Sequence, residues 1–129
     1  DASQISFRSC IFDVVFCIQN GISAFGVNKE RLIAESVRVA KAKGIVLFSS
    51  YSPRIWEARL EWFRKQSQFG LVGEIDEERT CDGTIVCKDG FRATTVGRDE
   101  FIKLFAKFGL EASLTEVDES SIFCKAIKE

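Results

Sequence analysis

Apolar residues in the first third of the chain follow first a strand pattern and then a helix pattern. Residues 12–18 are an almost continuous apolar run, typical of a strand buried on both faces of a parallel sheet. From Asn28, which has the side chain of a helix N-cap, apolar residues recur at helical spacing as far as Lys43. Gly44 ends this helix, and residues 45–48 form a second buried strand. The order strand, helix, strand predicts two parallel strands joined by a right-handed crossover.

The middle of the chain changes to a helix followed by a meander. Ser52-Pro53 opens a helix that runs to about residue 66, because proline is tolerated in a first turn. Residues 69–76 are interrupted by glycines and predict irregular structure. Two Asp-Gly pairs, at 82–83 and 89–90, are strong hairpin signals. They predict strands at 78–81, 84–88 and 91–95.

The last third predicts a helix and an antiparallel hairpin. Residues 99–108 carry four apolar residues on one helical face, and Gly109 ends the helix. Residues 110–117 and 122–127 form the closing strands. Asp118-Glu119-Ser120 between them is short enough for a tight turn, which makes the strands antiparallel.

Composition narrows the classes of function. The 129 residues have a net charge of −1, so no basic field favours nucleic acid, and no apolar run reaches the roughly 20 residues of a membrane span. The five cysteines are an odd number without close pairing, which argues against a secreted disulfide framework and favours a cytoplasmic protein. The meander register places Cys81 and Cys87 on opposite faces, so we expect neither a disulfide nor a shared metal site there. The chain has no histidine, the most common general base.

Three motifs occur in an informative order. Asp1-Ala2 is followed about ten residues later by Phe12-Asp13-Val14-Val15, and the next helix ends in Glu35-x-x-Arg38-Val39 before Gly44. The chain closes with a helix, a glycine, a strand, a hairpin and a strand. This order resembles the C-terminal half of class I S-adenosylmethionine-dependent methyltransferases. The family's Leu, Pro and first Gly are replaced here by Ala40, Ala42 and Lys43.

The resemblance implies an α/β fold, a Rossmann-like three-layer sandwich, of which residues 1–129 are a partial domain. Residues 1–50 would be the strand-helix-strand unit on the cofactor side. Residues 51–97 would be an inserted substrate cap, and residues 98–129 the closing helix and β-hairpin.

The resemblance also implies a site for S-adenosylmethionine. Asp1 takes the place of the acidic residue that accepts a hydrogen bond from the adenine amino group, and Ala2 offers its backbone N–H. Cys17, Ile18 and Gln19 lie where the family binds the methionine part of the cofactor, at the carboxyl end of a strand. The simpler alternatives stay open: a solvated first residue, two core side chains and an ordinary turn.

We expect the methyl acceptor to be a small molecule that contacts Asn20, Tyr51, Trp56 and Arg59. The alternative for the helix is that Trp56 and Trp62 only pack it against the core. Four acidic residues could face a cationic acceptor or be solvated. They are Glu74, Asp76, Glu77 and Glu78.

No catalytic acid or base and no metal ligand is predicted. Methyl transfer from a sulfonium to a nucleophilic acceptor mainly requires that donor and acceptor be held in line. The lack of histidine is therefore compatible with this class, although it disfavours many hydrolases. The family positions held by Asp13, Glu35 and Arg38 are structural.

Two parts of a complete methyltransferase are not found in the sequence. No glycine-rich loop follows a strand, and no acidic residue is placed for the ribose. Residues 12–18 would also form an unpaired apolar edge, which we expect a missing N-terminal half or a second copy to cover. The alternative function is a non-catalytic Rossmann-like interaction module that buries this edge on a partner. A dehydrogenase fragment is disfavoured by the terminal hairpin.

Overall fold

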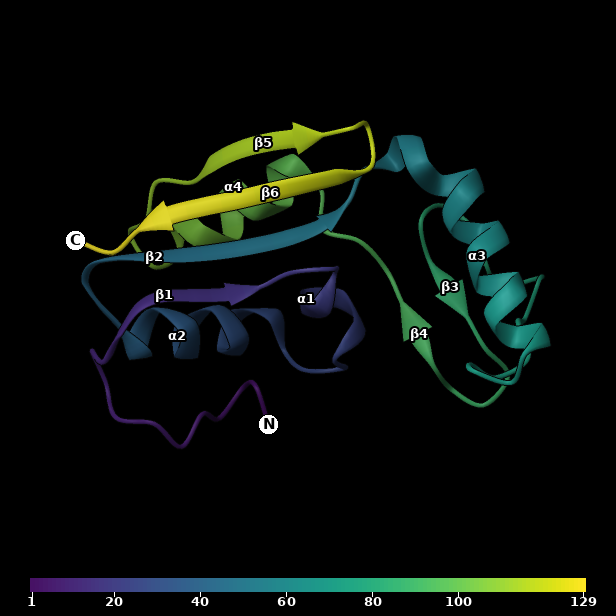
Figure 1. Ribbon diagram of the computed structural model, residues 1–129, viewed down its shortest axis with the longest axis horizontal. Helices are drawn as coiled ribbons and strands as arrows, with labels where there is room; N and C mark the ends of the chain where they lie inside the picture. Colours follow the sequence, from purple (N-terminus) through teal and green to yellow (C-terminus); the bar gives the residue numbers. More distant parts are fainter.

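The computed structural model describes residues 1–129 and contains one main sheet and one small one (Figure 1). The main sheet consists of β1 (Phe12–Cys17), β2 (Ala40–Tyr51), β5 (Ser113–Val117) and β6 (Ser121–Ile127) in the order β1-β2-β6-β5. β1 and β2 are parallel, whereas β6 is antiparallel to both β2 and β5. The predicted parallel pair and the predicted C-terminal hairpin are both confirmed.

Two longer helices cover one face of this sheet. α2 (Lys29–Val39) connects β1 to β2, and α4 (Arg98–Ala106) precedes the hairpin. Their side chains share a core of 14 buried residues with Val46 and Phe48 of β2 and the alternate residues of β6. The rings of Phe48 and Phe105 meet edge to face, with centroids 5.7 Å apart. The predicted core face of the last helix is confirmed, with Phe101 and Phe105 fully buried.

The opposite face of the sheet is open along β1. Val14 is 51% exposed and Phe16 is 64% exposed, whereas Val15 between them packs against the core. The neighbours of Val14 and Phe16 in β2 are Ile45 and Leu47, which are only partly buried. The prediction that residues 12–18 are buried on both faces is therefore wrong for this chain. The chain supplies the sheet and one layer of helices, and β1 lies at the sheet edge.

The helix predicted to run to Lys43 ends earlier, at Val39. Ala40 closes the last helical hydrogen bond and is itself extended, with φ −70° and ψ 141°. It pairs with Phe12, and the Lys43 N–H donates to the carbonyl of Lys128. The backbone of residues 40–44 thus gains hydrogen-bond partners in β1 and near the C-terminus. A longer helix would lose these hydrogen bonds. The expected strand at 45–48 is confirmed as the central part of a longer one.

The inserted segment contains a helix and a very small sheet. A 3₁₀ turn (η1, Pro53–Ile55) leads into α3 (Trp56–Gln68), as predicted from Ser52-Pro53. The meander is shorter than expected: β3 is Ile85–Val86 and β4 is Arg92–Ala93. No strand forms at 78–81, where Cys81 makes a single bridge to Thr84. All five cysteines are free, with Cys81 exposed and Cys87 buried.

The first residues of the chain are held on α2 by an ion pair. Arg38 donates two hydrogen bonds to the Glu35 carboxylate, of 2.7 and 2.8 Å, and one each to the carbonyls of Ile5 and Phe7. Glu35 also accepts the Ile5 N–H at 2.7 Å. Arg38 and the Ile5 N–H lower the pKa of Glu35 to about 2.

Replacing Glu35 by Gln tests this anchor through pH. Because the pKa of Glu35 is lowered on folding, its contribution is present above about pH 4.5 and is lost as the pH falls toward 2. We expect urea unfolding of the wild type to show a steeper loss of stability over this window than Glu35→Gln. Glu111→Gln, at an exposed carboxylate without an ion pair, is the control and should follow the wild type. Equal slopes for the wild type and Glu35→Gln would contradict this role.

Candidate functional site

The carboxyl ends of β1 and β2 lie side by side because the two strands are parallel. After β1 the chain turns through Gln19 and Asn20, both left-handed with φ of 55° and 62°, into the short helix α1 (Gly21–Ala24). Gly21 allows a close approach here, since a Cβ would lie 2.8 Å from Cys17 Sγ and 2.6 Å from Phe25 Cζ, and these side chains would have to move. After β2 the chain enters the inserted segment. Two loops that carry predicted site residues therefore start from the same end of the sheet.

Asn20 connects these strand ends to the inserted segment. Its side chain is buried, accepts a hydrogen bond from Ser50 Oγ at 2.7 Å, and donates one to the Thr94 carbonyl at 2.7 Å. Ser50 Oγ in turn accepts the Val96 N–H at 2.8 Å. Both ends of the Asn20 amide are thus used inside the protein. Asn20 positions the site rather than facing a ligand.

Arg59 of α3 is the charged residue at the centre of the site. It is only 5% exposed and donates to the carbonyls of Gly83 (2.6 Å), Ala93 (3.2 Å) and Thr94 (3.4 Å). The Thr94 carbonyl is therefore shared by Asn20 and Arg59. Burial lowers the pKa of the Arg59 guanidinium from its ordinary value.

Three aromatic rings surround this guanidinium. Its Cζ atom lies 5.1 Å from the ring centre of Tyr51 and 5.7 Å from those of Trp56 and Phe63. Cation–π attraction of this kind is strongest where water is excluded. The structure thus brings Tyr51, Trp56 and Arg59 together. That these residues contact a methyl acceptor stays a prediction.

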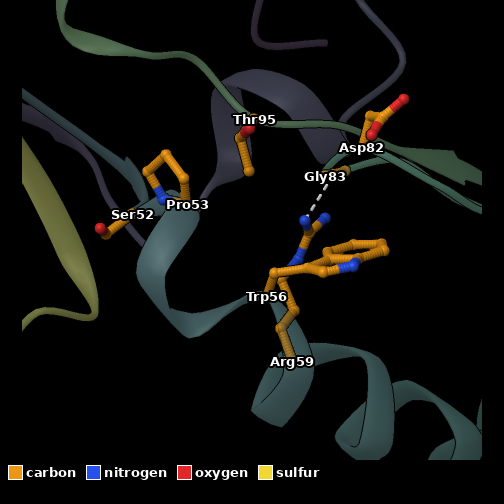
Figure 2. A pocket seen from close by; sticks show the side chains of 7 residues that line it. All are labelled: Ser52, Pro53, Trp56, Arg59, Asp82, Gly83 and Thr95. Atoms are coloured by element: carbon orange, nitrogen blue, oxygen red, sulfur yellow. Dashed lines mark hydrogen bonds between the residues drawn. The ribbon is translucent and has the colours of Figure 1, made fainter.

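A cavity of about 360 Å³ lies beside Arg59 and Trp56 (Figure 2). Seven residues line it: Ser52, Pro53, Trp56, Arg59, Asp82, Gly83 and Thr95. Figure 2 shows the guanidinium next to the Trp56 ring and directed toward Gly83, with Thr95 across the cavity from it and the Asp82 carboxylate directed away. Of the four predicted acceptor residues, Trp56 and Arg59 line the cavity, whereas Asn20 and Tyr51 are not among its lining residues.

The predicted cofactor residues divide into two groups. Cys17 is half-buried, and Ile18 and Gln19 are exposed at the carboxyl end of β1, so this strand end is accessible. Burial raises the pKa of the Cys17 thiol. Asp1 is exposed, and its Oδ1 accepts both the N–H and the hydroxyl of Ser3, while Ala2 packs against the core. No hydrogen bond joins the two groups, and Asp1 Oδ2 has no protein donor.

Two alternatives from the sequence are resolved by the packing. Trp62 is 61% exposed, so it does not pack α3 against the core as the simpler interpretation required. In the acidic run, Glu74 pairs with Lys88 and Glu77 with Arg64. These carboxylates already have cationic partners within the chain.

Sequence reasoning missed Ser50, Thr94 and the loop residues that line the cavity. Ser50 carried a weak signal, because a serine at the end of an apolar strand needs a hydrogen-bond partner if it is buried. Thr94 acts through its carbonyl, and Asp82-Gly83 was interpreted only as a turn. No side-chain pattern marks such contributions.

The sheet order, the helices on one face and the terminal hairpin define an α/β fold of the class I methyltransferase type, as predicted. Solved structures of low sequence identity, 19% and 14%, share this arrangement over almost the whole chain. This structural likeness establishes the fold. Neither family models nor curated protein sequences give a match.

Several of the similar structures are described as methyltransferases. One is a SAM-dependent methyltransferase from Methanosarcina mazei, with a TM-score of 0.66 and 19% identity over 99% of this chain and 64% of that one. Another, from Thermotoga maritima, is described as a possible histamine N-methyltransferase, with a TM-score of 0.62 and 14% identity over 99% and 61%. A third is a DhpI–SAM–HEP complex, with a TM-score of 0.52 and 20% identity over 98% and 54%. The chain thus spans about 60% of the length of the first structures it matches.

The longest helix, α3, has 13 residues, and none of the helices is long and apolar enough to cross a membrane.

Replacing Asn20 by Asp tests the buried network. The carboxylate can still accept from Ser50 but cannot donate to Thr94, so two acceptors would face each other in a buried place. We expect the free energy of unfolding to fall by about 1–3 kcal/mol in chemical denaturation. Asn28→Asp is the matched control, since Asn28 caps α2 by accepting the Arg31 N–H and Asp caps equally well. Equal stability of Asn20→Asp and Asn28→Asp would rule out a special role for Asn20.

Proposed function

We propose that the chain is part of an S-adenosylmethionine-dependent methyltransferase that acts on a small-molecule acceptor. The observation that carries the proposal is the fold, which matches methyltransferase structures over almost the whole chain. The accessible end of β1 lies at the carboxyl edge of the sheet, where α/β folds bind ligands. The inserted segment, which holds the cavity, follows β2 at the same edge. This arrangement supports a donor beside one strand and an acceptor beside the next.

The residues at the end of β1 fit the methionine part of the cofactor. Ile18 offers an apolar surface that is 40% exposed, and Cys17 a half-buried thiol. Asp1 has a free carboxylate oxygen that can accept from an adenine amino group. Bound S-adenosylmethionine supplies the electrophilic methyl group, and the protein residues orient the two reactants.

The site needs more chain than these 129 residues. About two fifths of the length of the similar structures has no counterpart in this chain, and the open face of β1 is apolar. We propose that an N-terminal segment covers this face and contributes the glycine-rich loop and the ribose ligand. A second copy of the chain is the other occupant to test. The alternative function, an interaction module without catalysis, shares this open face and differs in lacking cofactor binding.

Cofactor binding can be measured on the protein in its native length, established by intact mass spectrometry. We expect calorimetry to show saturable binding of S-adenosylmethionine. Iodoacetamide labelling of Cys17 should then slow about tenfold at a cofactor concentration ten times Kd. Labelling of Cys81, which is exposed in the inserted segment, is the internal control and should not change. A native mass matching only these 129 residues, with no binding, would favour the interaction module.

The open face predicts self-association of the chain when it is isolated. We expect sedimentation to show concentration-dependent oligomers of the wild type, and Phe16→Lys to weaken them about tenfold because it places a charge on the apolar face. Phe69→Lys is the matched control, because Phe69 is 80% exposed at the end of α3. A wild-type chain that stays monomeric at high concentration would show that the face needs no cover.

A further inference from the structure

Arg59 is a buried cation without an anion. The ion pairs of the chain all lie elsewhere, and none includes Arg59. Arg64, one turn further along α3, pairs with Glu77 in the usual way. A buried guanidinium is normally matched by a carboxylate, because removing a charge from water is costly unless an opposite charge compensates. The missing partner of Arg59 therefore requires an explanation.

The hydrogen bonds of Arg59 leave donors unused. A guanidinium has five N–H groups, and the acceptors here are three backbone carbonyls, which are neutral. The Nε atom is fully buried and has no partner at all. The aromatic rings of Tyr51, Trp56 and Phe63 favour the positive charge, but they do not neutralise it.

The space beside this guanidinium suits a small ligand. The cavity of about 360 Å³ has Arg59 and Trp56 on one side and Thr95, which supplies a hydroxyl, on the other (Figure 2). Asp82, the one acidic residue in the lining, is exposed and its carboxylate is directed away from Arg59. An anion that entered the cavity would meet a cation, a hydroxyl and an indole ring.

We propose that this cavity binds the anionic group of the methyl acceptor, a carboxylate or a phosphate-type oxyanion, through the Arg59 guanidinium. That the bound anion belongs to a methyl acceptor rests on the proposed function, whereas the anion site itself rests on Arg59 and its surroundings. Trp56 would cover the body of the ligand and Thr95 would donate to an anionic oxygen. Nη1 of Arg59 donates only to Gly83 within the chain, so its second N–H would donate to the ligand.

The test measures binding of simple anions to the chain. Trp62→Phe leaves Trp56 as the only tryptophan and removes a side chain far from any core contact. Inorganic phosphate, sulfate, acetate and benzoate are titrated at constant ionic strength, and Trp56 fluorescence is recorded. We expect a saturable change for at least one anion, and the comparison of oxyanions with carboxylates identifies the preferred group.

Arg59→Lys in this background keeps the charge but loses the planar fork, so Kd for the preferred anion should rise at least about tenfold. Arg64→Lys on the same helix is the matched control and should leave Kd unchanged within about twofold, since that side chain is solvent-exposed and ion-paired. No saturable change with any of the four anions would overturn the proposal. Equal losses in Arg59→Lys and Arg64→Lys would overturn it too.

A measurement on the unsubstituted chain covers the case in which Arg59→Lys does not fold. The ¹⁵N–¹H signal of Arg59 Nε should shift in saturable fashion during the same titration, and an unmoved signal overturns the proposal. Calorimetry with S-adenosylmethionine on the native-length protein separates the two hypotheses. Anion binding without cofactor binding would refute the methyltransferase and retain the anion site. Cofactor binding without anion binding would refute the anion site and retain the methyltransferase.

Discussion

The structure depends on the buried hydrogen bonds that meet at Asn20. The side chains of Ser50 and Asn20 and the carbonyl of Thr94 belong to three segments far apart in the sequence. Each polar group would lose water on burial, and each regains a partner only when all three segments are in place. The network therefore couples the end of β1, the end of β2 and the return of the inserted segment. The inserted segment is also held at its start, where Ser52 donates to Glu116 and Arg54 pairs with Glu119.

Arg59 performs a related task within the inserted segment. β3 and β4 have two residues each and satisfy few backbone groups, so the carbonyls of Gly83 and Ala93 take their donors from the Arg59 side chain. A neutral amide could supply such bonds without burying a charge. The guanidinium thus carries a charge that local packing does not require, and Arg59 also lines the cavity. Structural and ligand-binding roles coexist in one side chain because its five donors point in several directions.

The sequence predicted the elements well and the site only in part. Apolar periodicity identified the parallel pair, α3, α4 and the hairpin, because burial on one face imposes that spacing directly. The end of α2 was placed four residues late, since Ala40 to Lys43 suit a helix and only pairing with β1 and Lys128 draws them into β2. Trp56 and Arg59 were identified by residue type and helix face. The Thr94 carbonyl and the Ser50 hydroxyl were not, because backbone acceptors leave no trace in the sequence and depend on tertiary contacts.

The open face of the sheet and the exposed end of β1 are formed by the same row of β1 side chains. Side chains on β1 alternate, so Val15 and Cys17 face the core while Val14 and Phe16 face outward beside Leu47. A segment that covered Val14 and Phe16 would also come to lie next to Ile18, which ends the same row of side chains. Under the proposed function, covering the sheet and closing the cofactor site would therefore be one folding event. The acceptor cavity differs, since all its lining residues belong to the inserted segment, which is already fixed by contacts within this chain. Recognition of an anion and binding of the cofactor can thus be separated physically, although both take place at the same edge of the sheet.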